Sequence, residues 1–132
     1  QIAEDPGGIE EATLEAALPS PRRFAVMQTR RVLRALDFSS RVLTAYGHRC
    51  AICGIQLNLL DAAHILPASE PGSTDDTSNG VALCALHHRA YDRGLITFDT
   101  TFRVLMNEQR IGELKEVGRD GGVDRFRSYL RR

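Results

Sequence analysis

The sequence predicts a small α+β fold in which a central strand–loop–strand–helix segment lies between N-terminal helices and a C-terminal hairpin and helix. Three observations lead to this class. Apolar residues recur at helical spacing over 22–46, short runs typical of strands follow between 60 and 106, and polar or glycine-containing turns separate them. A chain of 132 residues that is 42% hydrophobic is long enough for one such domain.

The N-terminal segment differs in composition from the rest of the chain. Residues 1–21 carry five acidic and no basic residues, together with several prolines and glycines. This composition is typical of a linker or inter-domain tether, and a disordered chain end is the alternative. We therefore place the domain at 22–132, and because the sequence begins with Gln rather than Met, we expect a piece of a longer protein.

Two basic helices are predicted next, over 22–36 and 38–46, with Asp37 as the cap of the second and Gly47 as its stop. Residues 22–49 contain seven arginines and one acid, although the whole chain has a formal net charge of zero. A local basic surface of this kind favours phosphate contacts, and an ordinary solvated helix face is the alternative. The candidate DNA-binding residues are Arg22, Arg23, Arg30, Arg31, Arg34 and Arg41.

Four side chains form two short-spaced pairs that are typical of a tetrahedral zinc site. Cys50 and Cys53 are separated by two residues, and so are Cys84 and His87. Gly54 supports a turn after the first pair. A disulfide or inert buried cysteines are the alternatives, but three cysteines cannot pair completely. The spacing therefore favours a structural zinc ion bound by Cys50, Cys53, Cys84 and His87.

Three further polar residues are interleaved with these ligands. His64 ends a strand-like run over 60–65, Asn79 precedes Gly80 in a turn after the polar loop 69–78, and His88 begins a helix over 88–92. Taken singly, His64 is more simply a satisfied core histidine and Asn79 a turn former. Their combination within a zinc-binding segment indicates a catalytic site.

The C-terminal third predicts a hairpin and helices. The runs 94–99 and 102–106 alternate like strands around a turn at 99–101. A partly helical segment over 108–117, a break at 118–122 and a basic helix over 123–132 complete the chain.

The central segment resembles the HNH nucleases, whose fold is called ββα-metal. The resemblance covers roughly 46–98 and rests on Cys50-x-x-Cys53, Ala62-Ala63-His64-Ile65-Leu66-Pro67, Ser78-Asn79-Gly80-Val81-Ala82-Leu83-Cys84 and His87-His88-Arg89-Ala90-Tyr91-Asp92-Arg93-Gly94. Two departures stand out. Ala63 occupies the position where many relatives have Asp, and His87 replaces the last cysteine of a second Cys-x-x-Cys.

The resemblance implies a role for each of the three polar residues. His64 is expected to be the general base, His88 a ligand of one catalytic divalent cation, Mg²⁺ or Mn²⁺, and Asn79 either a ligand of that cation or the residue that orients the loop. Asp61 is a candidate to replace the missing acid, because alternate residues of a strand share a face. Asp92 is a second candidate, with a helix cap or an ion pair with Arg89 or Arg93 as its alternative role.

The sequence thus predicts a metal-dependent endonuclease that hydrolyses DNA, fused to an N-terminal target-recognition domain in a restriction or phage-defence enzyme. The alternatives are a non-catalytic, zinc-stabilised module that binds nucleic acid, and a nuclease specific for RNA or for a DNA structure. A monomer and a homodimer both stay open. No apolar run approaches the length of a transmembrane helix, and no signal peptide is recognisable, so no membrane contact is expected. Reduced cysteines fit a cytoplasmic location.

Overall fold

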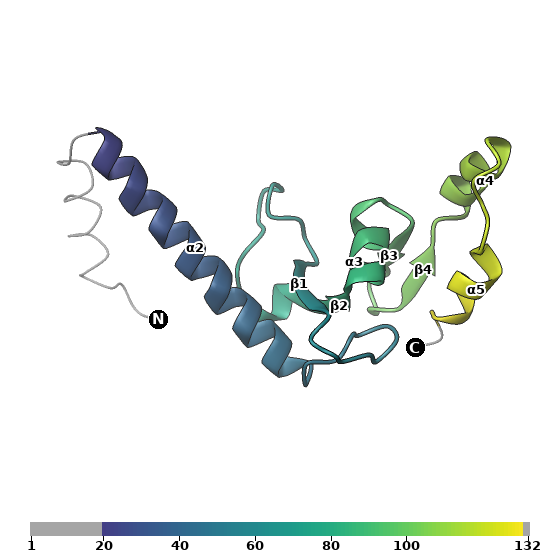
Figure 1. The fold of residues 1–132 in the computed structure, drawn as a ribbon, viewed down its shortest axis with the longest axis horizontal. Helices are drawn as coiled ribbons and strands as arrows, with labels where there is room; N and C mark the ends of the chain where they lie inside the picture. The colour runs from purple at the N-terminus through teal and green to yellow at the C-terminus, as the bar shows by residue number, and fades with distance from the viewer. Residues whose placement is uncertain (1–19, 131–132) are drawn as a thin grey trace. The chain divides into compact units, whose positions relative to one another are not determined.

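The computed structural model describes residues 20–130, in which helices and strands alternate as the sequence analysis anticipates (Figure 1). The elements are α2 (Ser20–Ala45), β1 (Leu60–His64), a 3₁₀ turn η1 (Thr77–Asn79), β2 (Gly80–Cys84), α3 (Ala85–Asp92), β3 (Ile96–Phe98), β4 (Val104–Met106), α4 (Glu108–Glu116) and α5 (Val123–Ser128). The chain divides into two compact units between Asp37 and Phe38. Most of the predicted tether, 1–19 of 1–21, lies outside the described residues.

Helix α2 corrects the prediction of two basic helices. It runs unbroken over Ser20–Ala45, and Asp37 lies inside it rather than at a cap. Asp in a helix interior costs at most about 0.7 kcal/mol relative to Ala, and no Pro or Gly interrupts 22–45, so nothing in the sequence forces a break. The stop is confirmed, because Gly47 has a φ of 64° and its N–H donates to the carbonyl of Thr44.

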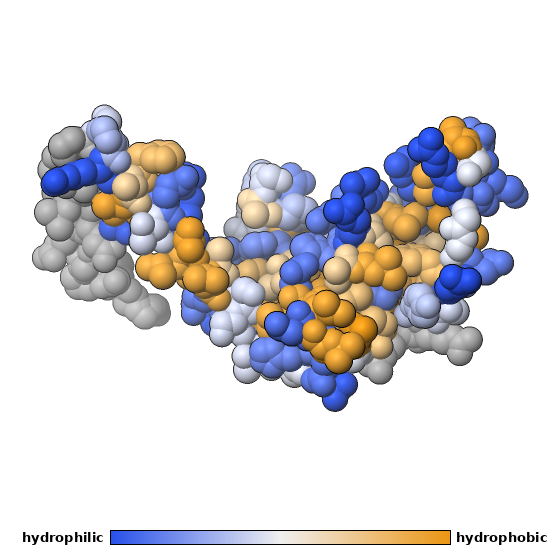
Figure 2. Space-filling view, in the orientation of Figure 1, coloured by the Kyte–Doolittle hydropathy of each residue, from blue (hydrophilic) through white to orange (hydrophobic). Residues whose placement is uncertain are grey.

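The side chains of α2 differ along its length. Its buried residues are Phe38 and Val42, whereas Phe24, Leu33 and Leu36 are each at least 60% exposed. Figure 2 shows hydrophobic side chains at the surface of this helix, between hydrophilic ones. The part of α2 from Phe38 onward therefore belongs to the hydrophobic core of the second unit.

An antiparallel pair of strands followed directly by a helix forms the centre of that unit. Strand β1 pairs with β2 in a register that places Ala62 opposite Ala82 and His64 opposite Gly80. All five residues of β2 are buried. Helix α3 begins at Ala85, three residues earlier than predicted, so His87 and His88 both lie within its first turns. This strand–strand–helix arrangement is the ββα core that the resemblance implies.

Gly80 allows the closest approach between this hairpin and α2. A Cβ at this position would lie 2.2 Å from Cγ2 of Val42 and 3.1 Å from the ring of Phe38. Asn79 ends the turn η1, as the turn prediction for Asn79-Gly80 implies, but the φ of Gly80 is −112°, which is ordinary extended backbone that any residue adopts. Gly80 is required for packing, and the chain reverses in the loop before it.

The predicted C-terminal hairpin and helices are confirmed. Strands β3 and β4 pair antiparallel, and the Asp99 carboxylate accepts hydrogen bonds from Thr101 and Arg103 in the turn between them. Asn107 caps α4 by accepting from the N–H of Arg110. Glu108 of α4 and Arg127 of α5 form an ion pair at 2.6 Å, which joins the two helices.

Within 20–130, no helix combines the length and the apolar character that crossing a bilayer requires.

Candidate metal centre and active site

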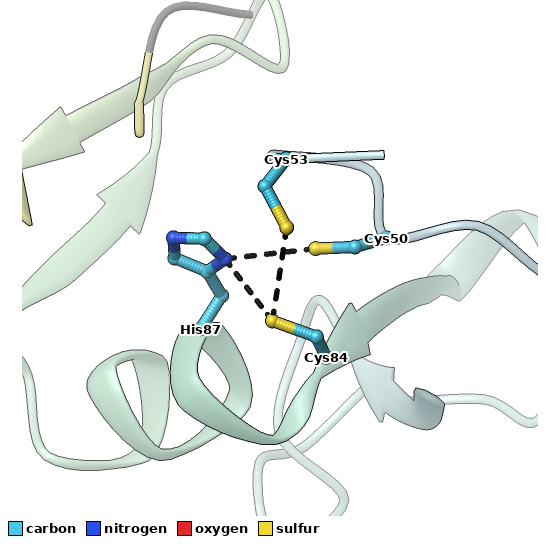
Figure 3. Close-up of side chains that lie close together, drawn as sticks. All are labelled: Cys50, Cys53, Cys84 and His87. Carbon is cyan, nitrogen blue, oxygen red and sulfur yellow. Dashed lines mark hydrogen bonds between the residues drawn. The ribbon is translucent and has the colours of Figure 1, made fainter. Parts of the chain in front are cut away.

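Cys50, Cys53, Cys84 and His87 converge on one point, and we call this group the Cys3His cluster (Figure 3). Cys50 and Cys53 come from the turn before β1, Cys84 ends β2, and His87 lies in the first turn of α3. Sγ of Cys84 lies 3.3 Å and Sγ of Cys50 3.6 Å from Nδ1 of His87, and Sγ of Cys53 lies 3.9 Å from Sγ of Cys84. A tetrahedral zinc ion would separate its ligand atoms by about 3.6–3.8 Å. The donor set and its spacing therefore fit zinc.

The pKa values of Cys50 and Cys84 are shifted in opposite directions within the Cys3His cluster. Burial raises the pKa of the Cys50 thiol, but hydrogen bonds from His87 and from neighbouring backbone N–H groups outweigh it and lower that pKa to about 5. Burial raises the pKa of Cys84 to about 11, and the negative charges of Cys50 and Cys53 add to the effect. Three thiolates in one buried place repel one another, and a divalent cation is what allows all three to ionise together.

His87 is buried and packs against Phe126. Its side chain is 1% exposed, and its ring lies 5.7 Å from that of Phe126. Its Nε2 atom is buried without a hydrogen-bond partner among the described residues. With Nε2 enclosed in this way, Nδ1 is the nitrogen available for a metal.

His64 lies at the end of β1, and two contacts fix its ring. The ring stacks on that of Phe38, with centroids 4.2 Å apart and planes 7° from parallel. Its Nε2 atom lies 3.0 Å from Oδ1 of Asp75. The other ring nitrogen, Nδ1, has no hydrogen-bond partner among residues 20–130. The side chain is 25% exposed, so this nitrogen is accessible from solvent.

Asn79 joins the two ends of the loop between β1 and β2. Its Oδ1 accepts from the N–H of Leu66 at 2.9 Å, and its Nδ2 donates to the carbonyls of Thr74 and Leu66 and to Oγ of Ser73. The amide of Asn79 is thus occupied by bonds within the loop. These bonds hold in place the segment that carries Asp75.

His88 lies between two carboxylates. Its Nδ1 is 2.8 Å from Oδ2 of Asp61, and its Nε2 is 3.4 Å from Oδ2 of Asp92. Asp61 therefore reaches His88 from β1, two residues before Ala63. The two carboxylates lie on opposite nitrogens of one ring, so either acid can share a cation with His88 through its own side of the imidazole.

His64 and His88 line the same hollow, which we call the histidine cleft. It has a volume of about 240 Å³, and Ala63, Tyr91 and Asp92 contribute to its walls. The hydroxyl of Tyr91 donates to the carbonyl of Ile65 at 2.7 Å, which ties α3 to the end of β1. The structure thus brings two of the three predicted catalytic side chains to one cleft and places the third, Asn79, in the adjoining loop.

The candidate DNA-binding arginines fall into two groups. Arg22, Arg23, Arg30, Arg31 and Arg34 lie on α2 before the division between the two units. Arg41 lies after it, and its guanidinium donates to Oγ1 of Thr77 at 2.7 Å and to the carbonyl of Asp75 at 2.9 Å. The bonds of Arg41 are made within the molecule and fix the Asp75 loop.

The sequence analysis did not identify Asp75 as a site residue. Asp75 and Asp76 occur in a polar loop with no motif spacing to either histidine. Composition shows only an acidic loop, and the contact with His64 depends on how Arg41 and Asn79 fold that loop.

Comparison with known proteins finds a nuclease family over the central segment. Residues 50–99 match the sequence model of a family described as HNH endonuclease. The chain is also similar to the solved structure of "Modification dependent TagI restriction endonuclease", with 28% sequence identity and a TM-score of 0.48 over 53% of this chain. The chain spans about a quarter of that protein, with 27% covered. No curated protein matches the chain significantly.

Proposed function

We propose that this chain, whose residues 50–99 belong to the HNH endonuclease family, is a nuclease that hydrolyses DNA phosphodiester bonds with the help of a divalent cation. One observation carries the proposal. His64 and His88 line a single accessible cleft, separate from the buried Cys3His cluster. A zinc-stabilised scaffold that only binds nucleic acid requires neither histidine in a cleft.

His64 is proposed as the general base. Because its Nε2 lies 3.0 Å from the Asp75 carboxylate, the ring proton is best placed on Nε2, where it donates to Asp75. Nδ1 then carries the lone pair and faces no protein partner among the described residues. A water molecule at Nδ1 would lose its proton to His64 as it attacks the phosphate. Phe38 and Asp75 prevent the ring from turning away.

The divalent cation, Mg²⁺ or Mn²⁺, would be held by His88 with a carboxylate. Asp61 is the stronger candidate, since it lies 2.8 Å from His88 and comes from the strand that carries His64. Asp92, at 3.4 Å, is the second. When bound, such a cation stabilises the charge on the phosphate and on the leaving 3′ oxygen.

Asn79 is proposed to position the loop rather than to bind the cation. Its amide oxygen and nitrogen are both used in bonds to Leu66, Ser73 and Thr74. Those bonds support the Asp75 side of the His64 ring, so the effect of Asn79 on the reaction would pass through His64.

The Cys3His cluster is proposed to bind a structural zinc ion. It is buried, its ligand atoms match tetrahedral spacing, and it joins three segments of the chain. We further propose a restriction or phage-defence role, a cytoplasmic location and a linked target-recognition domain that brings the nuclease to marked DNA by raising its local concentration.

A plasmid-nicking assay tests the proposal. Zinc-loaded protein should relax supercoiled DNA in the presence of Mg²⁺ or Mn²⁺ and leave it intact when EDTA replaces the cation. His64→Ala protein is the control for a contaminating nuclease. A single-stranded and a duplex RNA of matched sequence test the RNase alternative in the same buffer. Tight DNA binding without cleavage under any divalent cation would favour the non-catalytic module.

A further inference from the structure

A second hollow adjoins the histidine cleft and has arginines in its wall. It has a volume of about 330 Å³, and we call it the arginine hollow. His88 and Asp92 line both hollows. His64 lines the histidine cleft and not the arginine hollow, whereas Arg89 and Arg93 line the arginine hollow and not the histidine cleft. His88 therefore lies between the proposed base and the two arginines.

Arg89 and Arg93 are placed by α3 on the side of the helix that faces away from the core. His87 and Ala90 are the buried residues of α3, while Arg89 and Arg93 are exposed. They are four residues apart, so their side chains leave the helix on the same face, about one turn from each other. Neighbouring arginines in this position can contact one ligand together.

Neither guanidinium has a hydrogen-bond or ion-pair partner among residues 20–130. Asp61 and Asp92 also line the arginine hollow, and both contact His88 rather than either arginine. Other arginines of this unit are engaged, including Arg103 with Asp99, Arg110 with Glu113 and Arg127 with Glu108. Two adjacent, unpaired guanidiniums in the wall of a hollow form a site for an anion, and their planar donors match phosphate oxygens.

We propose that Arg89 and Arg93 bind a backbone phosphate of the DNA strand, on the leaving-group side of the bond that is cut. This site rests on the proposed nuclease function. In an in-line displacement the attacking water and the leaving oxygen lie on opposite sides of the phosphorus, so a water at His64 directs the leaving 3′ oxygen away from His64. The strand continues in that direction past His88 into the arginine hollow. The phosphate bound there is the one immediately 5′ of the scissile phosphate.

The simpler alternative is that both arginines are ordinary surface residues. Their effect on DNA would then match that of any other exposed arginine of the unit. Arg119 supplies the matched control, because it is exposed, lies in the turn between α4 and α5, and has no side-chain partner among the described residues.

The first test measures DNA affinity in zinc-loaded protein carrying His64→Ala, so that DNA stays intact in the presence of Mg²⁺. Adding Arg89→Ala and Arg93→Ala together should weaken binding at least about tenfold, as expected for lost charge-assisted hydrogen bonds. The slope of log affinity against log salt should fall by roughly one to two, the number of phosphate contacts removed. Adding Arg119→Ala instead should change the DNA affinity by less than about twofold and leave the salt slope nearly unchanged, as for surface charges away from the site. Equal effects of Arg119→Ala and the double variant would overturn the site.

The second test identifies the phosphate. A duplex carries one uncharged methylphosphonate linkage in one strand, and the cuts at every other linkage are measured for protein with an intact His64. Cutting at the linkage immediately 3′ of the uncharged one should fall about tenfold relative to its other neighbours, because one charge-assisted contact is lost there. In the Arg89→Ala, Arg93→Ala protein, which has already lost that contact, this local dip should disappear.

The outcomes separate this proposal from the function on which it rests. If the parent protein cuts DNA but the dip persists in the arginine variant, the arginine site is wrong and the nuclease function stands. If the parent protein cuts no DNA, the nuclease function is wrong. The affinity measurement then decides whether the two arginines still bind DNA, and an unchanged affinity would overturn the site as well.

Discussion

His87 and His88 are neighbours in the sequence, but their surroundings differ in almost every physical respect. His87 is 1% exposed and faces the sulfurs of Cys50 and Cys84. His88 has a side chain that is 27% exposed and faces the carboxylates of Asp61 and Asp92. Successive residues of a helix point about 100° apart, so one helical turn places one histidine in the core and the other at its edge.

The two surroundings suit two different roles: His87 suits a site that stabilises the fold, and His88 suits a site that takes part in the reaction. Soft sulfur ligands in a buried site suit a structural zinc ion, whereas oxygen ligands at an accessible site suit Mg²⁺ or Mn²⁺. The buried cluster holds the turn before β1, the end of β2 and the start of α3 together, and thereby positions the accessible site one residue away. We expect changes at the first site to affect the fold, and changes at the second to affect the reaction alone.

Loss of the zinc cluster should have the largest effect. Cys84→Ser removes one thiolate ligand, and apparent zinc-binding free energies of about 10–16 kcal/mol exceed or match the stability of a typical domain. We expect protein that is insoluble or lacks cooperative thermal unfolding, as seen by circular dichroism, with less than one zinc per chain. A folded variant without zinc would show that the cluster does not support the fold.

Loss of the proposed base should abolish cleavage and leave the fold unchanged. His64→Ala should slow DNA cleavage by about 100-fold or more, the usual contribution of a general base. Zinc content and DNA affinity should stay close to those of the parent, since a base acts mainly in the transition state. Residual cleavage above a few per cent of the parent rate would remove His64 from this role.

Loosening of the loop should give an intermediate effect. Asn79→Ala removes the amide that joins Leu66 to Thr74, and a misplaced ring at His64 can cost up to about 100-fold in rate. Limited proteolysis should detect faster cutting within 66–78, while zinc content stays at the parent value. If cleavage is lost but the loop keeps its protease resistance, Asn79 acts as a cation ligand instead.

Weakening of the cation site should have the smallest effect, and more cation should reverse it. Asp61→Asn should raise the Mg²⁺ concentration needed for half-maximal cleavage by about 10-fold or more, and Mn²⁺ should partly restore the rate because it tolerates imperfect sites. Asp92→Asn is the matched variant, because it changes the carboxylate that lies near the other ring nitrogen of His88. A larger shift for Asp92→Asn than for Asp61→Asn would reverse the choice between the two acids.

The sequence predicted the parts of the site that depend on short spacing. Two residues separate Cys50 from Cys53, and two separate Cys84 from His87, so the closeness of the ligands within each pair follows from spacing. The two pairs themselves meet through the packing of the turn before β1 against β2 and α3. Strand alternation made Asp61 a candidate for the cation site, but its contact with His88 was not predicted. The central strands, the C-terminal hairpin and their order followed from alternation and turn residues.

What the sequence could not predict depends on tertiary packing. Asp75 reaches His64 because Arg41, distant in sequence, and Asn79 together fold the loop. The ring of Phe38 stacks on His64 only because Gly80 lets α2 approach β2. Asp37 was predicted to cap a second helix, but α2 continues on both sides of it, so no helix begins there. The sequence did not show that Arg89 and Arg93 line one hollow, because this depends on how α3 packs in the fold.

The most direct test of the account is the zinc content of His88→Ala protein, measured together with its Mg²⁺-dependent DNA cleavage. If the two histidines serve different metal ions, this protein retains one zinc per chain and the thermal stability of the parent, and its cleavage falls below about 1% of the parent rate. His87→Ala, changed in the same way one residue earlier, loses zinc and stability together. Loss of zinc from His88→Ala, or cleavage close to the parent rate, would contradict the separation of the two sites.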